Sequence, residues 1–211
     1  MALAPGCPRC SAPVNGSGQE WRCQDHGSIV PLWRPAKADY DSFVEHLRRS
    51  RAIPTYLPWP LSPGWSITDF GCVARPDHGA RATVVSTAGA SDLDGVVELS
   101  VVAEEPGTGL GARCAGVHRT DPGADIGDGP PQAKVRIGGH PVSLWAVSTS
   151  GSDASFDRSV FAGEAQGRWL WLVLRPASAA LLLGDEWILL NVCDLGPELI
   201  DLPFGGNPPA W

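Results

Sequence analysis

Two short pairs of metal-ligand residues near the N-terminus constrain this chain more than any other feature of its sequence. Cys7 and Cys10 have two residues between them, and Cys23 and His26 repeat that spacing further on, in the strings CPRC and WRCQDHG. Two such pairs, about a dozen residues apart, form the ligand pattern of a zinc ribbon or finger. We therefore predict that Cys7, Cys10, Cys23 and His26 bind one zinc ion per chain.

The residues around the four cysteine and histidine positions favour a ribbon. Pro8 restricts the backbone after the first ligand, and Gly27 leaves it free after the last one. Asn15-Gly16 and Ser17-Gly18 predict a hairpin loop between the two pairs. Redox chemistry at CPRC is the alternative, but redox C-x-x-C motifs begin a helix after a strand, and we expect no strand before Cys7.

The number of ligands predicts what the zinc ion does. Three thiolates and one imidazole complete a tetrahedron, so no position is left for water or substrate. A segment of about thirty residues buries too little surface to fold alone, so metal binding would supply folding free energy. We predict a structural zinc ion in a ribbon module spanning residues 1–35.

Charge is distributed unevenly along the chain. The residues before Ile53 include seven Lys/Arg and five Asp/Glu, whereas the rest has nine Lys/Arg against eighteen Asp/Glu, and the whole chain has a formal net charge of −7. A hydrophobic content of 43% is that of a globular chain. An acidic main body argues against nucleic-acid binding, except through the N-terminal fifth.

The sequence predicts a cytoplasmic protein without a membrane span. No positively charged segment followed by an apolar run marks a secretory signal. The longest apolar runs, at 169–174 and 180–183, are far shorter than the ~20 residues that a spanning helix needs. Three cysteines belong to the metal motif, and we expect Cys72, Cys114 and Cys193 to be buried, reduced side chains.

One amphipathic helix and a proline-rich connector follow the module. Residues 37–51 place apolar side chains at helical spacing, with Asp39 as the predicted N-cap. Arg48, Arg49 and Arg51 complement the C-terminal end of this helix or, alternatively, contact a phosphate or partner. The connector at 54–65 carries several prolines, and we place the domain boundary near it, with helix and connector together at 36–64.

Period-two patterns then predict an α+β domain over residues 65–204, with a mainly antiparallel sheet. A hairpin is predicted at Gly138-Gly139, and the run at 168–174 is apolar on both faces, as in a covered central strand. A helix is predicted at 110–118, whereas 178–195 fits helix or strand equally. The last residues, 205–211, are predicted to be a flexible tail. The predicted strands are 81–89, 94–105, 133–147, 158–165 and 168–174.

The glycine-rich string GTGLGARCAG is the main candidate for ligand chemistry in the α+β domain. It matches a dinucleotide fingerprint, but Glu104 and Glu105 just before it would repel a pyrophosphate, and no second βαβ strand follows. The preferred interpretation is a tight strand-to-helix connection. The alternative is an anion site on the following helix N-terminus. Its residues would be Gly107, Gly109, Gly111 and Arg113.

Other polar residues match no catalytic motif. We interpret His118, Asp121 and Asp125 as solvated loop residues and expect His140 to be exposed after the hairpin turn. Glu104, Glu105 and Glu164 converge only if their strands are neighbours. Several tryptophans fill a core by default, or else line a groove for a flat or apolar ligand: Trp59, Trp65, Trp145, Trp169 and Trp171.

Five longer strings resemble a family of actinobacterial proteins of unknown function. They are CPRC…WRCQDHG, LPWPLSPGW, VVAEEPGTGLGAR, PPQAKV and VFAGEAQGRWLW, and the resemblance runs from about Cys7 to Pro203. It implies an aromatic residue in many members at the position of Cys114, which argues against a role for this thiol. Members of that family often carry the label phosphotransacetylase, which the size and organisation of this chain do not suit. The resemblance implies no catalytic residue.

Three functional hypotheses follow, in decreasing order of support. The first is a non-catalytic zinc-ribbon protein that binds a partner protein or a small ligand through its acidic domain. The second is an enzyme or sensor of a small phosphorylated or acylated metabolite, using the loop from Gly107 to Arg113. The third is nucleic-acid binding through the ribbon and Arg48–Arg51, which would be sensitive to salt.

Overall fold

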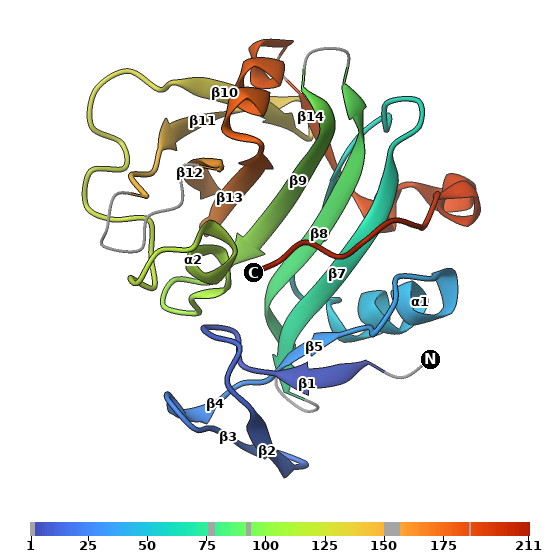
Figure 1. Cartoon of the computed structure of the whole chain (residues 1–211), viewed down its shortest axis with the longest axis vertical. Coiled ribbons are helices and arrows are strands. Elements are labelled where there is room, and N and C mark those ends of the chain that lie inside the picture. Colours follow the sequence, from blue (N-terminus) through green and yellow to red (C-terminus); the bar gives the residue numbers. More distant parts are fainter. Residues whose placement is uncertain (1–2, 76–78, 92–93, 150–156, 186) are drawn as a thin grey trace.

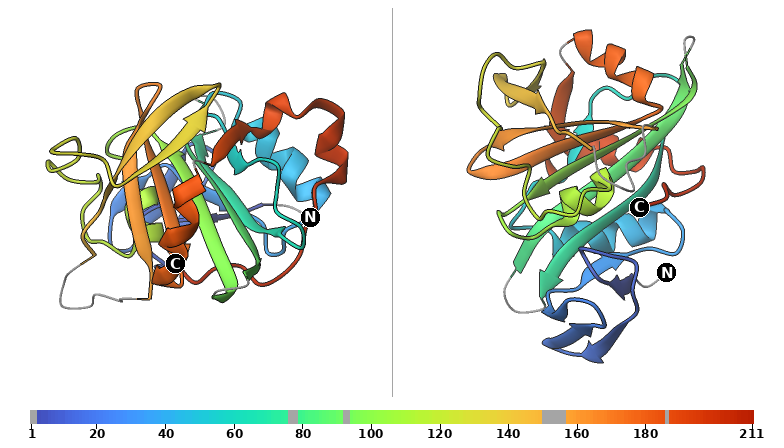
Figure 2. Two further views of the ribbon diagram at one scale, coloured as in Figure 1. Left: turned by 90° about the horizontal axis from the view of Figure 1, so that it is seen from above. Right: turned by 60° about the vertical axis from the view of Figure 1, so that its left-hand side comes forward.

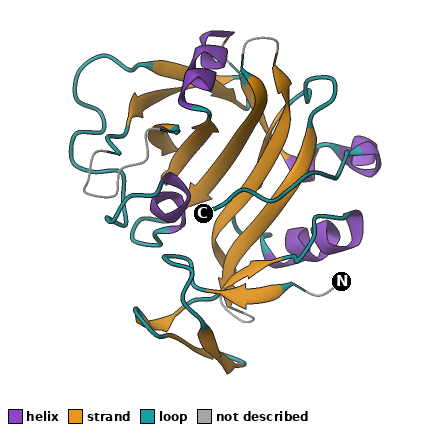
Figure 3. Ribbon diagram, in the orientation of Figure 1, coloured by secondary structure: helices purple, strands orange, loops and turns teal. Residues whose placement is uncertain are grey.

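One long, curled sheet dominates the structure. A computed structural model describes residues 3–75, 79–91, 94–149, 157–185 and 187–211. Their main sheet has eleven strands in the order β1-β5-β7-β8-β9-β13-β12-β11-β10-β14-β6, and a separate three-stranded sheet, β2-β3-β4, extends from it (Figure 1). Short helices pack around the main sheet (Figure 3). The prediction of a mostly antiparallel sheet with few helices is confirmed.

The first half of the main sheet is a series of antiparallel neighbours. Its strands are β1 (Ala4–Gly6), β5 (Leu32–Arg34), β7 (Ser66–Arg75), β8 (Gly79–Ser91), β9 (Gly95–Glu104) and β13 (Arg168–Arg175). Three of the predicted strands, at 81–89, 94–105 and 168–174, therefore lie side by side in its middle.

The second half of the sheet curls away from the first. Its strands are β12 (Ser159–Ala165), β11 (His140–Ala146), β10 (Ala133–Ile137), β14 (Ile188–Asn191) and β6 (Tyr56–Pro58). Among the strands that the structure describes, only the β10–β14 pair is parallel. The curl, visible in Figure 2, brings β6 against β8 and β9. The predicted hairpin is confirmed, because Gly138 and Gly139 both have positive φ between the paired residues Ile137 and His140.

Alternation along β9 and β13 divides the core between the two faces of the sheet. Leu99 and Leu172 point into the curled interior, where they join residues of β10, β14 and the 3₁₀ helix η1 (Ala177–Asp185). Val102 and Trp171 point to the opposite face, beneath the short helix α2 (Leu110–Ala115). The prediction that the 168–174 strand is covered on both faces is confirmed.

The amphipathic helix α1 (Tyr40–Arg49) forms where its apolar spacing predicts. Asp39 caps it, since its side chain accepts a hydrogen bond from the Ser42 N–H at 2.8 Å. The apolar face packs Phe43 against Phe70 of β7, with ring centroids 4.8 Å apart. Arg49, at the helix end, pairs with Glu45 and lies over the Trp33 ring.

The segment that fitted helix or strand equally contains both. Residues 177–185 form η1, and β14 follows, with Leu189 buried in the interior of the sheet. A 3₁₀ turn, η2 (Val192–Asp194), ends the segment, and a second one, η3 (Gly196–Asp201), follows it. Packing, rather than periodicity, decides these elements, because β14 finds partners on both sides in β10 and β6.

The small sheet is inserted into the main one. Its strands are β2 (Val14–Ser17), β3 (Glu20–Cys23) and β4 (Gly27–Ile29), and it occupies the segment 7–31, which we call the module. Strands β1 and β5 flank the module and pair with each other at the edge of the main sheet. The main sheet extends across the predicted boundary near residue 65. Strands β1, β5 and β6 precede that boundary, and they belong to the same sheet as β7, which follows it.

The C-terminal segment lies against the main sheet, although the sequence predicts a flexible tail at 205–211. Phe204 bridges to Ile67, and the Gly205 N–H donates to the Ile67 carbonyl at 3.1 Å. The Trp211 ring then packs against two guanidinium groups, 3.8 Å from Arg34 and 5.1 Å from Arg113. No helix among the described residues is long and apolar enough to cross a membrane.

Candidate metal centre

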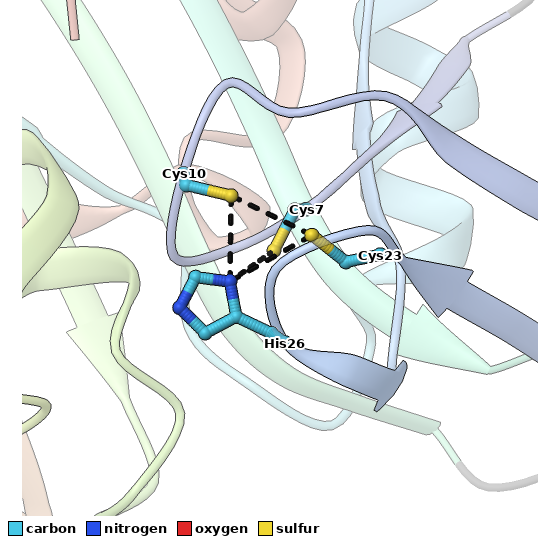
Figure 4. Close-up of side chains that lie close together, drawn as sticks. All are labelled: Cys7, Cys10, Cys23 and His26. Atoms are coloured by element: carbon cyan, nitrogen blue, oxygen red, sulfur yellow. Dashed lines mark hydrogen bonds between the residues drawn. The ribbon is translucent and has the colours of Figure 1, made fainter.

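The four predicted ligands converge at one point of the module. The Nδ1 atom of His26 lies 3.3 Å from the Cys10 Sγ and 3.7 Å from the Sγ atoms of Cys7 and Cys23 (Figure 4). Cys10 and Cys23 have their sulfur atoms 3.5 Å apart, and all four ligand atoms lie within 4.8 Å of one another. We call this group the metal cluster.

These separations fit a tetrahedral ion. With Zn–S bonds of about 2.3 Å and Zn–N bonds of about 2.0 Å, the edges of a zinc tetrahedron measure roughly 3.5–3.8 Å. Four of the six pairwise separations are 3.3–3.7 Å and all six are within 4.8 Å, so the four atoms lie close to where they would stand around an ion. Sulfur and imidazole ligands are those that zinc prefers. The residues present fit a metal ion.

Local backbone geometry positions the thiols in two tight turns. Cys7 follows β1, and its Sγ accepts a hydrogen bond from the Arg9 N–H at 3.4 Å. In the same way, the Ala12 N–H donates to the Cys10 thiol, and the Asp25 N–H donates to the Cys23 thiol. Because such N–H groups stabilise a thiolate, the turns prepare the sulfur atoms for a cation.

The thiols differ in their acidity in the absence of a cation. Burial raises the pKa of the Cys10 thiol to about 12. Burial acts in the same direction on Cys23, but hydrogen bonds with His26 and with the Asp25 N–H outweigh it and lower the pKa of Cys23 to about 6. Cys23 is therefore more easily deprotonated than Cys10.

Two arginines join the metal cluster to α2. Arg9 stands between the first two ligands, and its guanidinium donates to the Gly107 carbonyl at 2.8 Å and to the Thr108 carbonyl at 3.3 Å. In the opposite direction, Arg113 of α2 donates to the Cys7 carbonyl. Since Arg113 also donates to the Trp211 carbonyl, the module, α2 and the C-terminal segment meet at this residue.

The glycine-rich loop has its backbone groups occupied by the protein itself. The Gly107 N–H donates to the Asp121 carboxylate at 2.8 Å, and the Leu110 N–H donates to Glu104 at 2.8 Å. Gly109 adopts a left-handed φ of 86°, and a Cβ on Gly111 would lie 2.3 Å from the Trp171 ring. These contacts account for the glycines as a tight strand-to-helix connection. Anion binding by the loop stays a prediction.

Glu104 is a buried carboxyl beneath α2. Its side chain is fully buried, and burial raises its pKa to about 7, although hydrogen bonds from the N–H groups of Gly111 and Leu110 act in the opposite direction. Among the described residues, its second oxygen, Oε1, has no hydrogen-bond partner. Because the side chain is sealed from solvent, we assign it the role of capping α2.

The other acidic and histidine candidates are dispersed. Glu105 pairs with Arg81, and Glu164 accepts from the Gly167 N–H, so these carboxylates serve different partners from Glu104. Asp121 caps the Gly107 turn, whereas Asp125 and His140 are exposed. In the part of the chain that the structure describes, the metal cluster is the one grouping of three or more potential ligands.

The three remaining cysteines do not behave alike. Cys72 and Cys114 are buried as predicted, and burial raises the pKa of each thiol to about 12, which makes both unreactive. Cys193 is exposed, so its predicted burial is wrong. It lies in η2 on the surface, where the chain turns after β14 and only its neighbour Val192 faces the core.

The tryptophans are divided between core and surface. Trp171 is fully buried, and Trp145 and Trp169 are half-buried elsewhere on the sheet. Trp59 and Trp65 instead line a groove of about 600 Å³ that also contains Leu61, Glu198 and Asp201. An adjoining hollow adds Trp187, whose ring meets Trp65 edge to face at 6.5 Å. We call this surface the tryptophan groove.

Sequence reasoning overlooked three residues that the structure makes prominent. Arg9 lies inside CPRC and reaches α2, a contact that spacing cannot show. Trp187 follows η1 and completes the tryptophan groove. His46 was detectable, because it stands three residues after Phe43 on the apolar face of α1. It is buried against Phe43 and Phe70, and burial lowers its pKa to about 3.

Comparison with known proteins assigns this chain to a family. Residues 1–211 match the group described as "Family of unknown function (DUF6758)", so the chain belongs to that family over its whole length. No curated protein and no solved structure shows a significant match.

Proposed function

We propose that this member of the DUF6758 family is a non-catalytic binding protein of the cytoplasm. In this proposal a structural zinc ion holds a ribbon module against the main sheet, and the tryptophan groove receives a partner protein. The observation that carries the proposal is the groove itself, an accessible aromatic surface with an acidic rim. The cytoplasm is favoured because it keeps zinc-binding thiols reduced.

The ligand set supports a structural role for zinc. Three thiolates and one imidazole saturate a tetrahedral ion, and each thiolate adds negative charge that reduces its strength as a Lewis acid. Only three residues of the module form its buried apolar cluster, Cys7, Cys23 and Ile29, and two of these are ligands. Metal binding would therefore supply most of the free energy that folds the module.

The shape of the tryptophan groove suits an extended peptide. The indole of Trp59 is half-buried and therefore accessible, while Trp65, which lines the same groove, is 9% exposed. Aromatic grooves of this kind bind proline-rich segments, because a polyproline helix is preformed and packs its rings on indoles. Glu198 and Asp201 line the same groove. We therefore specify the partner as a proline-containing segment that carries a Lys or Arg.

The two functional regions lie at opposite ends of β7. The tryptophan groove borders Ser66, at the start of the strand, whereas β5 pairs with Cys72 and Val73 near its end and leads into the module. Figure 1 shows the module beyond that end of β7. A partner in the groove would leave the metal cluster uncovered.

Elemental analysis tests the zinc assignment. Protein purified without added metal should contain about one zinc per chain, and a cobalt-substituted sample should show the spectrum of tetrahedral, thiolate-rich coordination. Five-coordinate cobalt, or an exchangeable water ligand, would show an open position and would contradict the structural role.

Selection from a random peptide display library tests the groove. The enriched peptides should contain proline with a nearby Lys or Arg. Trp59→Ala should weaken their binding by about 2 kcal/mol, roughly thirtyfold, as at other aromatic hot spots. Asp201→Lys should weaken it as well. The matched control is Trp145→Ala, a half-buried tryptophan on β11 outside the groove. Equal binding by the Trp59 variant and the parent protein would refute the site.

A further inference from the structure

We propose a second binding site, for a small phosphate-bearing metabolite, in a pocket between the metal cluster and α2. The pocket measures about 390 Å³, within the range typical of small-molecule sites. The module forms one wall, and α2 with the 117–120 loop forms the other. Because zinc orients part of this wall, the inference rests on the zinc occupancy proposed above.

Cationic and imidazole side chains dominate the lining of this pocket. Five such residues line it, together with the proposed ligand Cys10 and no carboxylate: Arg9, His26, Arg113, His118 and Arg119. This concentration is unusual in a chain with a formal net charge of −7. A smaller hollow, also lined by Arg9, adds Arg75 and Arg81. We call the larger hollow the basic pocket.

Metal binding would make His26 a hydrogen-bond donor to the basic pocket. Its Nδ1 faces the three thiols, and the rest of the ring points away from them (Figure 4). When Nδ1 binds a metal ion, the proton of a neutral imidazole resides on Nε2. Because His26 lines the pocket, this N–H is available to an anion there.

The arginines retain donors for a ligand. Arg9 uses Nε and Nη2 for the carbonyls of Thr108 and Gly107, which leaves its Nη1 unused by these bonds. Arg119 is exposed and forms no ion pair with any residue that the structure describes. His118, beside it, is also exposed. These groups come from two walls and approach the pocket from different directions.

The positive charge around the basic pocket exceeds what is needed to neutralise the proposed zinc centre. A zinc ion with three thiolates and a neutral imidazole carries one net negative charge, which a single neighbouring arginine would offset. Arg113 is directed to the Cys7 carbonyl, not to a sulfur atom. Arg119 and His118 lie on the far wall, in the loop after α2. We therefore assign the excess charge to a ligand.

Phosphate fits the arrangement better than other anions. Its three terminal oxygens accept hydrogen bonds from several directions, whereas a carboxylate has two oxygens in one plane. A pocket of this volume holds a metabolite, and the acidic surface elsewhere would repel a long polyanion such as nucleic acid.

Calorimetry on the zinc-loaded full chain tests the proposal. Inorganic phosphate and pyrophosphate should bind saturably, and Arg119→Ala should weaken binding at least tenfold. His118→Gln should weaken it less. The matched control is Arg48→Ala, an exposed arginine on α1 outside the pocket, which should leave binding unchanged. Zinc content and circular dichroism, measured first, establish that each variant is folded and metal-loaded.

Three results would overturn the proposal. One is the absence of phosphate and pyrophosphate binding by zinc-loaded protein. A second is binding that Arg48→Ala reduces as much as Arg119→Ala does, because that would indicate general charge attraction. A third is equal affinity for acetate. Failure of the zinc assignment would appear separately, in the metal analysis, and Trp59→Ala should leave phosphate binding intact because the groove is a different site.

Discussion

The module and the main sheet achieve their structure by different means. The module has a buried cluster of three residues, of which two belong to the metal cluster, and its strands β2 and β3 are mostly exposed. The main sheet buries leucine, valine and tryptophan side chains on both faces of β13. The difference shows that four residues at the right spacing can replace a hydrophobic core, provided that a metal ion joins them.

The two regions nevertheless depend on each other at one junction. Arg9 donates to the loop before α2, Arg113 donates to the module, and Trp21 of β3 meets Trp33 of β5 edge to face at 5.5 Å. The flanking strands β1 and β5 continue the main sheet. Loss of metal should therefore unfold the module locally, without removing the edge strands that anchor it.

Cys23→Ser should have the largest effect and should be confined to the module. Structural zinc sites contribute roughly 10–16 kcal/mol of apparent binding free energy, and loss of a thiolate should remove most of it. We expect hydrogen exchange to accelerate across 7–31 while the amides of β8, β9 and β13 stay protected. Cys193→Ser, which changes an exposed cysteine outside the metal cluster, is the control. If the Cys23 variant retained zinc and its module stayed protected from exchange, the conclusion that metal binding replaces a hydrophobic core in the module would be contradicted.

Leu172→Ala should show the opposite pattern. The side chain is fully buried in β13, so its truncation should lower the free energy of unfolding of the main sheet by about 2–5 kcal/mol. Zinc content of the folded protein should stay the same. Leu181→Ala, at a leucine that is 76% exposed, should change stability by no more than about 0.5 kcal/mol. Chemical denaturation with zinc analysis measures both, and zinc loss from folded Leu172→Ala protein would contradict the separation.

Glu104→Gln should change how stability depends on pH. The pKa of Glu104 in the folded protein, about 7, exceeds the ordinary glutamate value of 4.5 that applies to the unfolded chain. The folded protein therefore binds this proton more tightly than the unfolded chain does. Protonation of Glu104 thus stabilises the folded state, and this contribution is complete below pH 4.5 and is lost as pH rises through 7. A tenfold difference in proton affinity between the folded and unfolded chain corresponds to about 1.4 kcal/mol. Denaturation curves of the variant should show a smaller decline over this interval, and an unchanged decline would disprove the assignment.

Arg9→Ala should have the smallest effect and should sharpen the description of the junction. Removal of its bonds to Gly107 and Thr108 should loosen the contact between module and α2 but leave the four ligands in place. We expect full zinc content with several-fold faster exchange of the 107–110 amides. Arg22→Ala, at an exposed arginine of β3, should leave exchange there unchanged. Equal exchange in both variants would show that Arg9 does not hold the contact.

Local patterns predicted much of the fold because they report short-range physics. Helix α1 follows from apolar spacing with an Asp39 cap, and the β10–β11 hairpin follows from two glycines that tolerate positive φ. Long-range packing escaped prediction. Leu189 became part of a strand because β6 and β10 lie on either side of it. Trp211 lies against Arg34 and Arg113, neither of which is near it in sequence.

The strand before Cys7 illustrates the limit of motif reasoning. We expected no strand before Cys7, and we used that expectation as an argument against a redox motif. The structure instead has the strand β1, which ends at Gly6. No helix follows it, and Cys23 and His26 close the metal cluster instead. The ligand spacing was the informative signal, because it involves four residues, whereas β1 exists only through pairing with β5.

By itself, the sequence determined which four residues form the metal cluster and the antiparallel class of the main sheet, because residue spacing and side-chain alternation act over a few residues. Only the tertiary structure decided that Glu104 caps the N-terminus of α2, that two tryptophans line a groove, and that arginines and histidines from two segments line one pocket. These arrangements join residues far apart in the chain. Folding places them through packing of the whole sheet, which no local pattern records.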